Sequence, residues 1–404
     1  MLKIIHTADW HLGQTFFGYD RRMEHLDFLN WLRREVRICQ ADVLLVSGDV
    51  FDSPNPSAES QKLYYRFLHD ITRDNPQLQL VIIAGNHDSA ARLEAPSPLL
   101  ESMNIVVRGV IRRRSDGSID TDHLIVPLRK EGDIAAYCLA VPYLRQGDYP
   151  QADSYAEGVQ SFYTELIEQA LPLRKPLVAM GHLQATGSEL SVDDRSERTV
   201  VGGLEAVSPQ VFDGKVEYVA LGHLHRAQRV SGRELVRYAG APLPMSFAEK
   251  HYRQGVMLVT LDEDGRKPAV VERRLYEPPV SLWSLPTEEA EIEGVLEAIA
   301  GLPEGEPDDS SPYLEIKAKV TQPDPTLKYK IQEALKGKQV RLARIVAVAP
   351  PKAESSRRLT TYEEVQQLRP IDIALDFYKQ KYGGSEMPDA LQQLFNEVAR
   401  ENVL

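Results

Sequence analysis

Residues that commonly bind metals recur at five places in the first 225 residues, and each place directly follows an apolar run. Carboxylate, amide and imidazole groups together suit manganese, iron or zinc. The five segments read TADWHLG, VSGDVFD, AGNHDS, AMGHLQ and GHLHRA, and they supply Asp9, His11, Asp49, Asn86, His87, His182, His223 and His225. The pattern therefore indicates a shared site for divalent ions, provided that the fold brings the five segments together.

Each segment alone also has a purely structural explanation. Asp9 can cap the segment after it, and a Gly-Asp or Gly-His pair after a strand is commonly structural. The spacing of His223 and His225 favours a shared role as ligands, because alternate residues of an extended segment point to the same side. Five such segments, each after an apolar run, favour one common site. The remaining histidines are expected to be structural; they are His6, His25, His69, His123 and His251.

The apolar runs predict the elements that must position these residues. Short runs rich in Val, Ile and Leu suit strands that are buried on both faces. They read LKII, DVLLVSG, LQLVIIAG, PLVAMG and EYVALG, with helical patterns at 21–40 and 57–74 between the first three. Such a chain forms right-handed crossover units, and ligands of open α/β sheets bind beyond the carboxyl ends of the strands. We therefore expect a layered α/β domain, with ELVRYAG and GVMLVTL as added antiparallel strands and glycines 48, 85, 181 and 222 allowing sharp turns and close approach.

The rest of the chain reads as smaller parts. The composition changes near YEPPVSLWSLP, after which a strand, a helix and a strand follow, then a polar linker and two amphipathic helices. We expect a metal-site domain at 1–277, a small α/β cap domain at 278–349, a linker at 350–360 and a helical partner-binding element at 361–404.

Charge and composition narrow the function classes. Cys39 and Cys138 have no disulfide or zinc motif around them. The N-terminus does not read as a signal peptide and no apolar run is long enough to span a membrane, so we expect a cytoplasmic protein. A net charge of −12 argues weakly against nucleic acid. Two basic clusters are nevertheless candidates for contact with DNA, although a solvated face is equally compatible with each. They comprise Arg112, Arg113 and Arg114, and Lys328, Lys330, Lys336, Lys338, Arg341 and Arg344.

The ordered set D-x-H, G-D, G-N-H-D, G-H and G-H-x-H resembles the calcineurin-like metallophosphoesterase family. This resemblance implies a four-layer α/β/β/α domain with two divalent ions, most often manganese, bridged by Asp49. It assigns Asp9, His11 and His225 to one ion and Asn86, His182 and His223 to the other, each together with Asp49. It places His87 beside the scissile phosphate, where it steadies developing charge or protonates the departing oxygen.

The flanks HTADWHLGQ, EHLDFLNWL and GDVFDSPNPS resemble the bacterial SbcD-type nucleases, a branch of this family. That resemblance implies an exonuclease on double-stranded ends and an endonuclease on hairpin or single-stranded DNA. It also implies a homodimer bound to an SbcC-type ABC ATPase in a heterotetramer that repairs DNA. Archaeal and eukaryotic relatives carry histidine where this chain has Asp52, so the role of that position is open.

Two other functions fit the five segments. A small-molecule or cyclic-nucleotide phosphodiesterase needs the same metal site but neither the cap domain nor the helical tail. A scaffold that binds DNA or a partner without cleavage does not need a complete ligand set with His87. Both alternatives therefore explain less of the chain than a DNA nuclease does.

Overall fold

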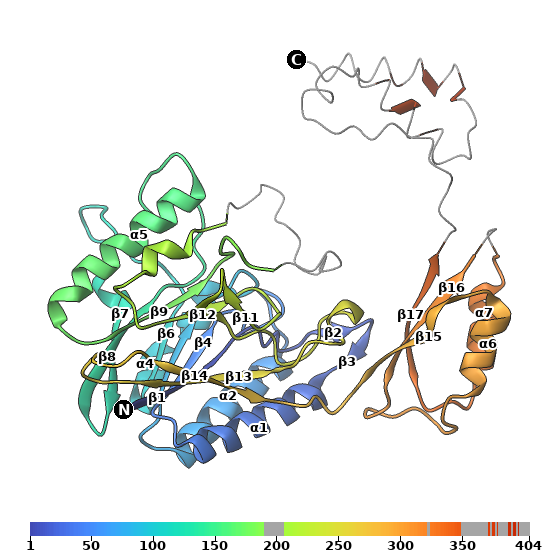
Figure 1. Ribbon diagram of the computed structural model, residues 1–404, viewed down its shortest axis with the longest axis horizontal. Coiled ribbons are helices and arrows are strands. Elements are labelled where there is room, and N and C mark those ends of the chain that lie inside the picture. The colour runs from blue at the N-terminus through green and yellow to red at the C-terminus, as the bar shows by residue number, and fades with distance from the viewer. Residues whose placement is uncertain are drawn as a thin grey trace. The chain divides into compact units, whose positions relative to one another are not determined.

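Two six-stranded sheets form the larger part of the chain (Figure 1). The computed structural model describes residues 1–189, 206–320 and 324–348, with isolated positions between 371 and 395. The first sheet has the order β14-β13-β1-β4-β5-β6, with β1, β4, β5 and β6 parallel and β13 antiparallel to β1. Its strands are β1 Leu2–Thr7, β4 Val43–Ser47, β5 Gln79–Ile83, β6 Ile105–Arg108, β13 Gly255–Leu261 and β14 Val270–Leu275.

The second sheet has the order β11-β12-β10-β9-β8-β7. Its strands are β7 Ile125–Lys130, β8 Asp133–Ala140, β9 Leu177–His182, β10 Tyr218–Gly222, β11 Gln228–Val230 and β12 Arg233–Tyr238. The run ELVRYAG forms β12, which is antiparallel to β11, as expected, but parallel to its other neighbour β10. The short strand β11 reverses the chain first, so the next strand returns in the direction of β10. GVMLVTL forms β13 and is antiparallel, as expected.

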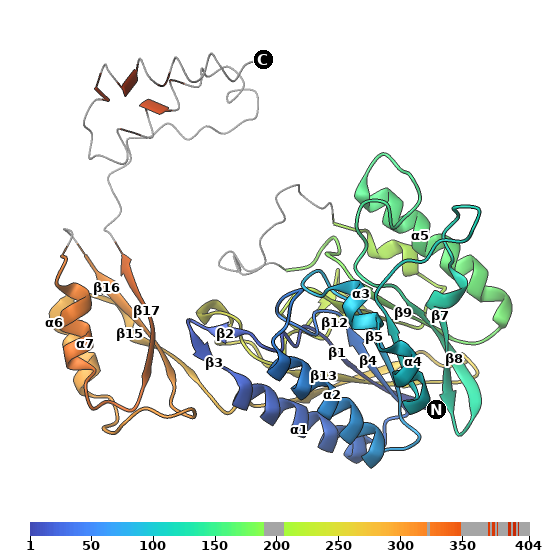
Figure 2. The same cartoon turned by 180° about the vertical axis from the view of Figure 1, so that it is seen from behind.

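Helices cover the outer faces of both sheets. Helices α1 Arg22–Cys39 and α2 Ala58–Asp74 lie side by side on the first sheet, as Figure 2 shows from behind, and α5 Tyr155–Ala170 packs on the second. Short helices follow β5, namely α3 Ala90–Glu94, α4 Ser97–Leu100 and the 3-10 turn η1 Glu101–Met103. Further 3-10 turns are η2 Asp122–Leu124, η3 Leu171–Leu173, η4 Pro209–Phe212 and η5 Phe247–Glu249.

The core consists of three apolar layers, which produce the expected α/β/β/α arrangement. One layer lies between the two sheets, and the other two separate each sheet from its helices. The central strands β4, β5, β9 and β10 are buried at every position. Their unbroken apolar runs follow from this, because both faces of each strand meet apolar side chains.

A third sheet, β15-β16-β17, forms a smaller module. It contains β15 Leu282–Ala290, α6 Ile292–Ala300, β16 Tyr313–Lys319, α7 Leu327–Ala334 and β17 Arg341–Val348, and its apolar core lies under the two helices. The sequence pattern indicated β16, α7 and β17 but missed β15 and α6. A small hairpin, β2 Thr15–Phe16 and β3 Tyr19–Asp20, precedes α1.

The remaining expectations about organisation are not settled by the fold. Residues 1–348 cluster as one unit and 349–404 as another, and the predicted boundary at 277/278 stays a prediction. The predicted linker at 350–360 and, apart from isolated positions, the helical element at 361–404 lie outside the described residues. In the described part of the chain, no helix has both the length and the apolar character needed to cross a membrane.

Candidate metal centre

The carboxyl ends of β1, β4, β5, β9 and β10 bring the predicted ligands to one edge of the two sheets. The side-chain oxygen Oδ1 of Asn86 lies 2.9 Å from His182 Nε2 and 3.1 Å from His223 Nδ1. The same His182 Nε2 lies 3.3 Å from Asp49 Oδ2. These four side chains, which are predicted to share one ion, therefore converge on one small volume.

The other predicted ligands lie beside this group. His11 Nε2 is 3.7 Å from Asp49 Oδ2, and the rings of His11 and His225 are 5.2 Å apart. Asp9 Oδ1 accepts a hydrogen bond of 2.9 Å from the backbone N–H of His223. Asp49 thus lies between the two halves of the cluster, which is the position that a bridging ligand requires.

The backbone at this edge is strained in the way expected of a functional site. Four residues of the cluster have positive φ angles although none is glycine: Asp9 (54°), His11 (46°), Asp49 (49°) and His223 (104°). Such conformations cost about 1–3 kcal/mol each and persist where the surrounding structure enforces them. All four residues lie just after the ends of β1, β4 and β10, where the backbone turns at the shared site.

Two glycines show why the ligands can approach so closely. Gly48 has a φ of 88°, and a Cβ atom there would lie 2.2 Å from His182 Nδ1. Gly222 lies within β10, where a Cβ atom would lie 1.9 Å from the carbonyl oxygen of Ser47. Gly48 therefore serves the expected turn, whereas Gly222 serves close packing of the two sheets.

Burial and charge set the pKa values of the cluster. Burial raises the pKa of Asp9 above its usual value, partly offset by His182 and His225. Burial acts in the same direction on Asp49, but the neighbouring His182 and His11 outweigh it and hold the pKa of Asp49 below its usual range. Burial alone would lower the pKa of His182, yet Asp49 and Asp9 raise it to about 9. The two buried carboxylates therefore require cationic partners at this edge.

Carboxylates and carbonyls outside the cluster fix the orientation of its imidazoles. His182 Nδ1 lies 2.9 Å from the carbonyl oxygen of Ser47, and His225 Nδ1 lies 3.2 Å from Glu249 Oε1. Both contacts assign a proton to Nδ1 and direct Nε2 towards the site. His11 Nδ1 lies 3.4 Å from Asp52 Oδ1, so the carboxylate of Asp52 is placed to orient His11.

Asp88 joins the two loops that carry Asp49 and Asn86. Its buried carboxylate accepts hydrogen bonds from the backbone N–H groups of Val50 (3.1 Å), Phe51 (2.9 Å) and Gly85 (2.9 Å). Burial and the charge of Asp49 raise the pKa of Asp88 to about 6 against the effect of these bonds. The sequence pattern assigned no role to Asp88 within GNHDS, and it missed Glu249, which no motif marks.

The donor atoms of the cluster fit a divalent cation. Among the residues that the structure describes, Asp9 Oδ2 and His11 Nε2 are buried without any hydrogen-bond partner. The potential ligand atoms form two groups, and the atoms within each group lie within 4.8 Å of one another. The groups are Asp9, Asp49 and His182, and Asp49, His11 and His87. Asp49 belongs to both groups. Buried polar atoms without partners are rare in proteins, and a bound ion would satisfy these two.

His87 lies at the open side of the cluster. Its backbone N–H donates to Asp49 Oδ1 (2.8 Å), and its ring Nδ1 donates to the carbonyl oxygen of Asp52 (2.9 Å). Its ring centroid lies 4.9 Å from that of His11. The bond to Asp52 leaves Nε2 as the ring atom available for chemistry.

Comparisons with known proteins agree with this geometry. A model of the calcineurin-like phosphoesterase family matches residues 2–227. The chain is 38% identical to the SbcD component of the SbcCD nuclease of Rhodobacter capsulatus over 369 residues, which cover 87% of this chain and 89% of the relative. The chain belongs to the SbcD family of nucleases.

Two further relatives and a second domain match extend this family assignment. The SbcD component of the SbcCD nuclease of Bacillus subtilis is 30% identical over 98% of both chains, and that of Escherichia coli is 34% identical over 64% of this chain and 65% of the relative. Residues 278–382 match the type 5 capsule protein repressor C-terminal domain. The likeness to SbcD therefore reaches beyond the metallophosphoesterase part. It establishes a nuclease family whose metallophosphoesterase domain binds divalent metal.

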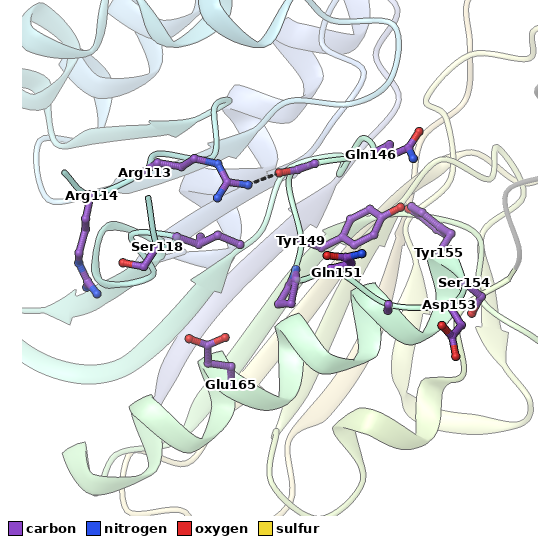
Figure 3. A pocket seen from close by; sticks show the side chains of 14 residues that line it. Arg113, Arg114, Ser118, Gln146, Tyr149, Gln151, Asp153, Ser154, Tyr155 and Glu165 are labelled. Atoms are coloured by element: carbon purple, nitrogen blue, oxygen red, sulfur yellow. Dashed lines mark hydrogen bonds between the residues drawn. The ribbon is translucent and has the colours of Figure 1, made fainter. Parts of the chain in front are cut away.

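The first basic cluster of this SbcD family member is largely neutralised by its own chain. Arg112 pairs with Glu94 at 2.6 Å, and Arg114 pairs with Asp122 at 2.8 Å. Arg113 donates to the carbonyl oxygens of Gly117 and Gly147, and the second of these bonds is drawn in Figure 3. The three guanidinium groups therefore have structural partners already.

Arg113 and Arg114 also line a cavity of about 790 Å³ between the β6–β7 connection and α5 (Figure 3). Tyr149, Tyr155 and Glu165 lie on its other sides. The cavity shares no residue with the histidine cluster, so it is separate from the candidate metal centre.

The second basic cluster contains both a buried arginine and exposed or partly exposed residues that form ion pairs. Arg341 is buried and stacks on Tyr313, with its guanidinium carbon 4.0 Å from the ring centroid. Lys330 pairs with Asp324, Lys336 with Glu333, Lys338 with Glu304 and Arg344 with Glu315. Five of the six residues therefore contact groups of the small module, and Lys328 is exposed. Among the described residues, neither cluster presents a row of uncommitted cations.

Proposed function

We propose that this chain is a metal-dependent DNA nuclease that acts with an SbcC-type ABC ATPase in the processing of double-strand breaks and hairpins. One observation carries the proposal: the predicted ligands converge around Asp49 and leave the buried atoms Asp9 Oδ2 and His11 Nε2 without partners. The family assignment supplies the substrate class, because the relatives are nucleases of the SbcCD complex by name.

We assign two divalent ions to the site, with manganese as the most suitable metal. Asp9, His11 and His225 would hold one ion, and Asn86, His182 and His223 the other, with Asp49 shared. Mixed oxygen and imidazole donors suit manganese. Bound divalent ions lower the pKa of a coordinated water and stabilise charge on the leaving oxygen of a phosphodiester.

The chain's own groups would orient the substrate and transfer a proton. His87 Nε2 faces the open side, where it would contact the scissile phosphate and protonate the departing oxygen. Its backbone bond to Asp49 and its ring bond to the Asp52 carbonyl fix the ring before substrate arrives. Asp88 would keep the loops of Asp49 and Asn86 at a constant separation.

We also assign the partner contacts from the family. The relatives' names place them in SbcCD complexes. From the family resemblance we further expect a homodimer of this chain with two ATPase molecules. The predicted helical element at 361–404 would bind the ATPase through its apolar face. If a protein lacking 360–404 still bound the ATPase in a pull-down, this assignment would be wrong.

Metal content and cleavage by wild type and Asp49→Ala provide the main test. Wild type with manganese should cut linear duplex and hairpin DNA, whereas Asp49→Ala should lose both metal and cleavage by about 10³-fold or more, since metal-ion catalysis supplies several kcal/mol. Asp116→Ala, in an exposed turn, should behave as wild type. Metal-independent cleavage would contradict the proposal.

The small-molecule alternative needs the same site, so a second substrate separates the two. A generic phosphodiester such as bis(p-nitrophenyl) phosphate reports the metal chemistry alone. Hydrolysis of this ester without any DNA cleavage, with or without the ATPase, would favour a small-molecule phosphodiesterase.

A further inference from the structure

The loop after β8 carries a cation close to the metal site that no sequence motif marked. It reads VPYLRQ, at residues 141–146, and it begins at the same edge of the second sheet as the ligand strands. The backbone N–H of Tyr143 donates a hydrogen bond of 2.8 Å to the carbonyl oxygen of Ala84. Ala84 immediately precedes the GNH segment, so this bond ties the loop to the segment that carries Asn86 and His87.

Tyr143 connects the loop to a candidate ligand. Its ring is half-buried and meets the ring of His182 edge-on, with the centroids 6.2 Å apart. The guanidinium of Arg145 lies over the Tyr143 ring at 5.3 Å from its centroid. The backbone of Arg145 is fixed as well, because its N–H donates 2.8 Å to Asp148 Oδ2 and its carbonyl accepts from Asp148 N–H.

Arg145 differs from the two basic clusters in what its guanidinium contacts. Among the residues that the structure describes, no carboxylate lies within salt-bridge distance of it, and the residue is exposed. Arg112 and Arg114, in contrast, are paired with acidic side chains. A guanidinium that contacts the face of an aromatic ring still directs its N–H groups outward in its own plane, where a phosphate can accept hydrogen bonds from them.

We propose that Arg145, positioned by Tyr143, binds a backbone phosphate of the DNA strand close to the scissile phosphate. This inference rests on the proposed nuclease function. The separations of 6.2 and 5.3 Å keep the guanidinium near the metal edge. Because a strand advances about 3.4 Å per nucleotide along the helix axis, Arg145 would reach a phosphate within about three nucleotides of the cleavage point.

A phosphate contact explains why the cation is needed in this chain. The net charge is −12, so the protein as a whole repels DNA. A guanidinium that binds phosphate offsets this repulsion locally and sets the register of the strand, but it reads no base sequence. A small phosphodiester does not extend from the metal edge to Arg145, so this contact would distinguish a nucleic-acid strand from a small ester.

The test compares Arg145→Gln with Arg266→Gln in the full-length protein. Arg266 is the control, because it is also exposed and lies in the β13–β14 turn, next to the end of β13 that pairs with Leu2 at the start of β1. Unlike Arg145, it lies 3.8 Å from a carboxylate, that of Asp264. Binding to a labelled DNA duplex is measured without added metal over a series of salt concentrations. Arg145→Gln should weaken binding about tenfold and reduce the salt slope by about 0.7 to 0.9, as expected for one lost phosphate contact.

Three further measurements exclude a general loss of structure. Metal content and bis(p-nitrophenyl) phosphate hydrolysis should be unchanged in Arg145→Gln, while its KM for DNA cleavage should rise with kcat retained. Tyr143→Phe keeps the ring and should bind DNA as wild type does, whereas Tyr143→Leu should share part of the defect. Rescue by phenylalanine would show that the ring positions the arginine.

The outcomes separate this inference from the nuclease proposal. If Arg145→Gln matched Arg266→Gln in affinity and salt slope, the phosphate contact would be refuted. If wild type bound DNA but hydrolysed only the small ester, the nuclease function would fall, and the binding comparison would still decide the role of Arg145. A wild type without any affinity for DNA would overturn both.

Discussion

The metal-site edge and the Arg112–Arg114 segment are both dense in charge, but they differ in how the charge is satisfied. Asp9 and His11 retain buried atoms without hydrogen-bond partners in the described part of the chain, and both have positive φ angles. The guanidinium groups of Arg112 and Arg114 are each paired with carboxylates of the same chain. The combination of a positive φ angle and a buried side-chain atom without a partner therefore marks the site better than the number of charges does. His6 and Arg341 also have such an atom, but neither has a positive φ angle.

Two buried histidines show the same contrast on a smaller scale. His6 is buried beside Tyr218, and burial lowers its pKa to about 3. His182 is equally buried, but Asp49 and Asp9 overcome the effect of burial and raise its pKa to about 9. The nearby carboxylates therefore reverse the effect of burial on His182, whereas burial prevails at His6 and at the candidate ligand His223, whose pKa it also lowers to about 3.

Among the variants that test the metal-site edge, His87→Ala is expected to cause the largest loss of cleavage. The variant His87→Ala should lower kcat for DNA by about 10²–10⁴-fold, the usual range for loss of a general acid, with metal content unchanged. Cleavage rates and metal analysis of the purified protein check this. His69→Ala, at an exposed position of α2, is the matched control.

A loss of metal in His87→Ala would contradict the assigned role. His87 offers an atom within 4.8 Å of potential ligand atoms of His11 and Asp49, so geometry alone permits ligation. Loss of one ion together with activity would make His87 a ligand, and the site would then extend further than the sequence indicated.

A smaller effect is expected from Glu249→Gln, which tests the support of His225. Glutamine still accepts the hydrogen bond from Nδ1 but removes the negative charge that strengthens the imidazole as a ligand. Manganese affinity should fall about 10- to 100-fold, with kcat restored at high manganese. Titration with manganese monitored by electron paramagnetic resonance measures the affinity directly.

Glu304→Gln is the control for this variant, because Glu304 is an exposed glutamate of the small module. It should leave manganese affinity unchanged. Equal affinity in wild type and Glu249→Gln would mean that Glu249 has only a structural role, through its bond to the N–H of Met245.

The convergence of the candidate ligands and the central strands were predictable because both follow from local patterns. The strands β4, β5, β9 and β10 are buried on both faces, so their sequences are unbroken apolar runs. The ligands follow these strands directly, and the rule that ligands bind beyond the carboxyl ends of strands places them together.

Other parts of the site could not be predicted because their partners are distant in sequence. Glu249, the last residue of η5, meets His225 across the intervening β11–β12 hairpin. The sequence did not indicate a role for Arg145, because a single arginine in a loop belongs to no recognisable motif. The parallel pairing of β12 with β10 was also not predicted, because a run of alternating residues does not indicate which neighbours it will join.

A moderate effect on stability is expected at His6. In the unfolded chain its pKa is near 6.5, whereas in the folded chain it is about 3. Between these values the unfolded state binds more protons, so the free energy of unfolding falls as pH drops from 6.5 towards 3. His6→Asn should flatten this dependence in urea unfolding measured in EDTA, whereas His69→Asn should leave it unchanged.

The smallest effect on DNA binding is expected from the Arg112–Arg114 segment, although it carries three consecutive positive charges. Replacing Arg112, Arg113 and Arg114 together by glutamine should leave DNA affinity and its salt slope close to wild type, because their guanidinium groups already have partners in the chain. The cost should appear in stability, at no more than about 1 kcal/mol per exposed pair. Urea unfolding and the same salt titration measure both quantities. A salt slope reduced as far as that of Arg145→Gln would reverse the comparison, since it would mean that these pairs open to bind phosphate.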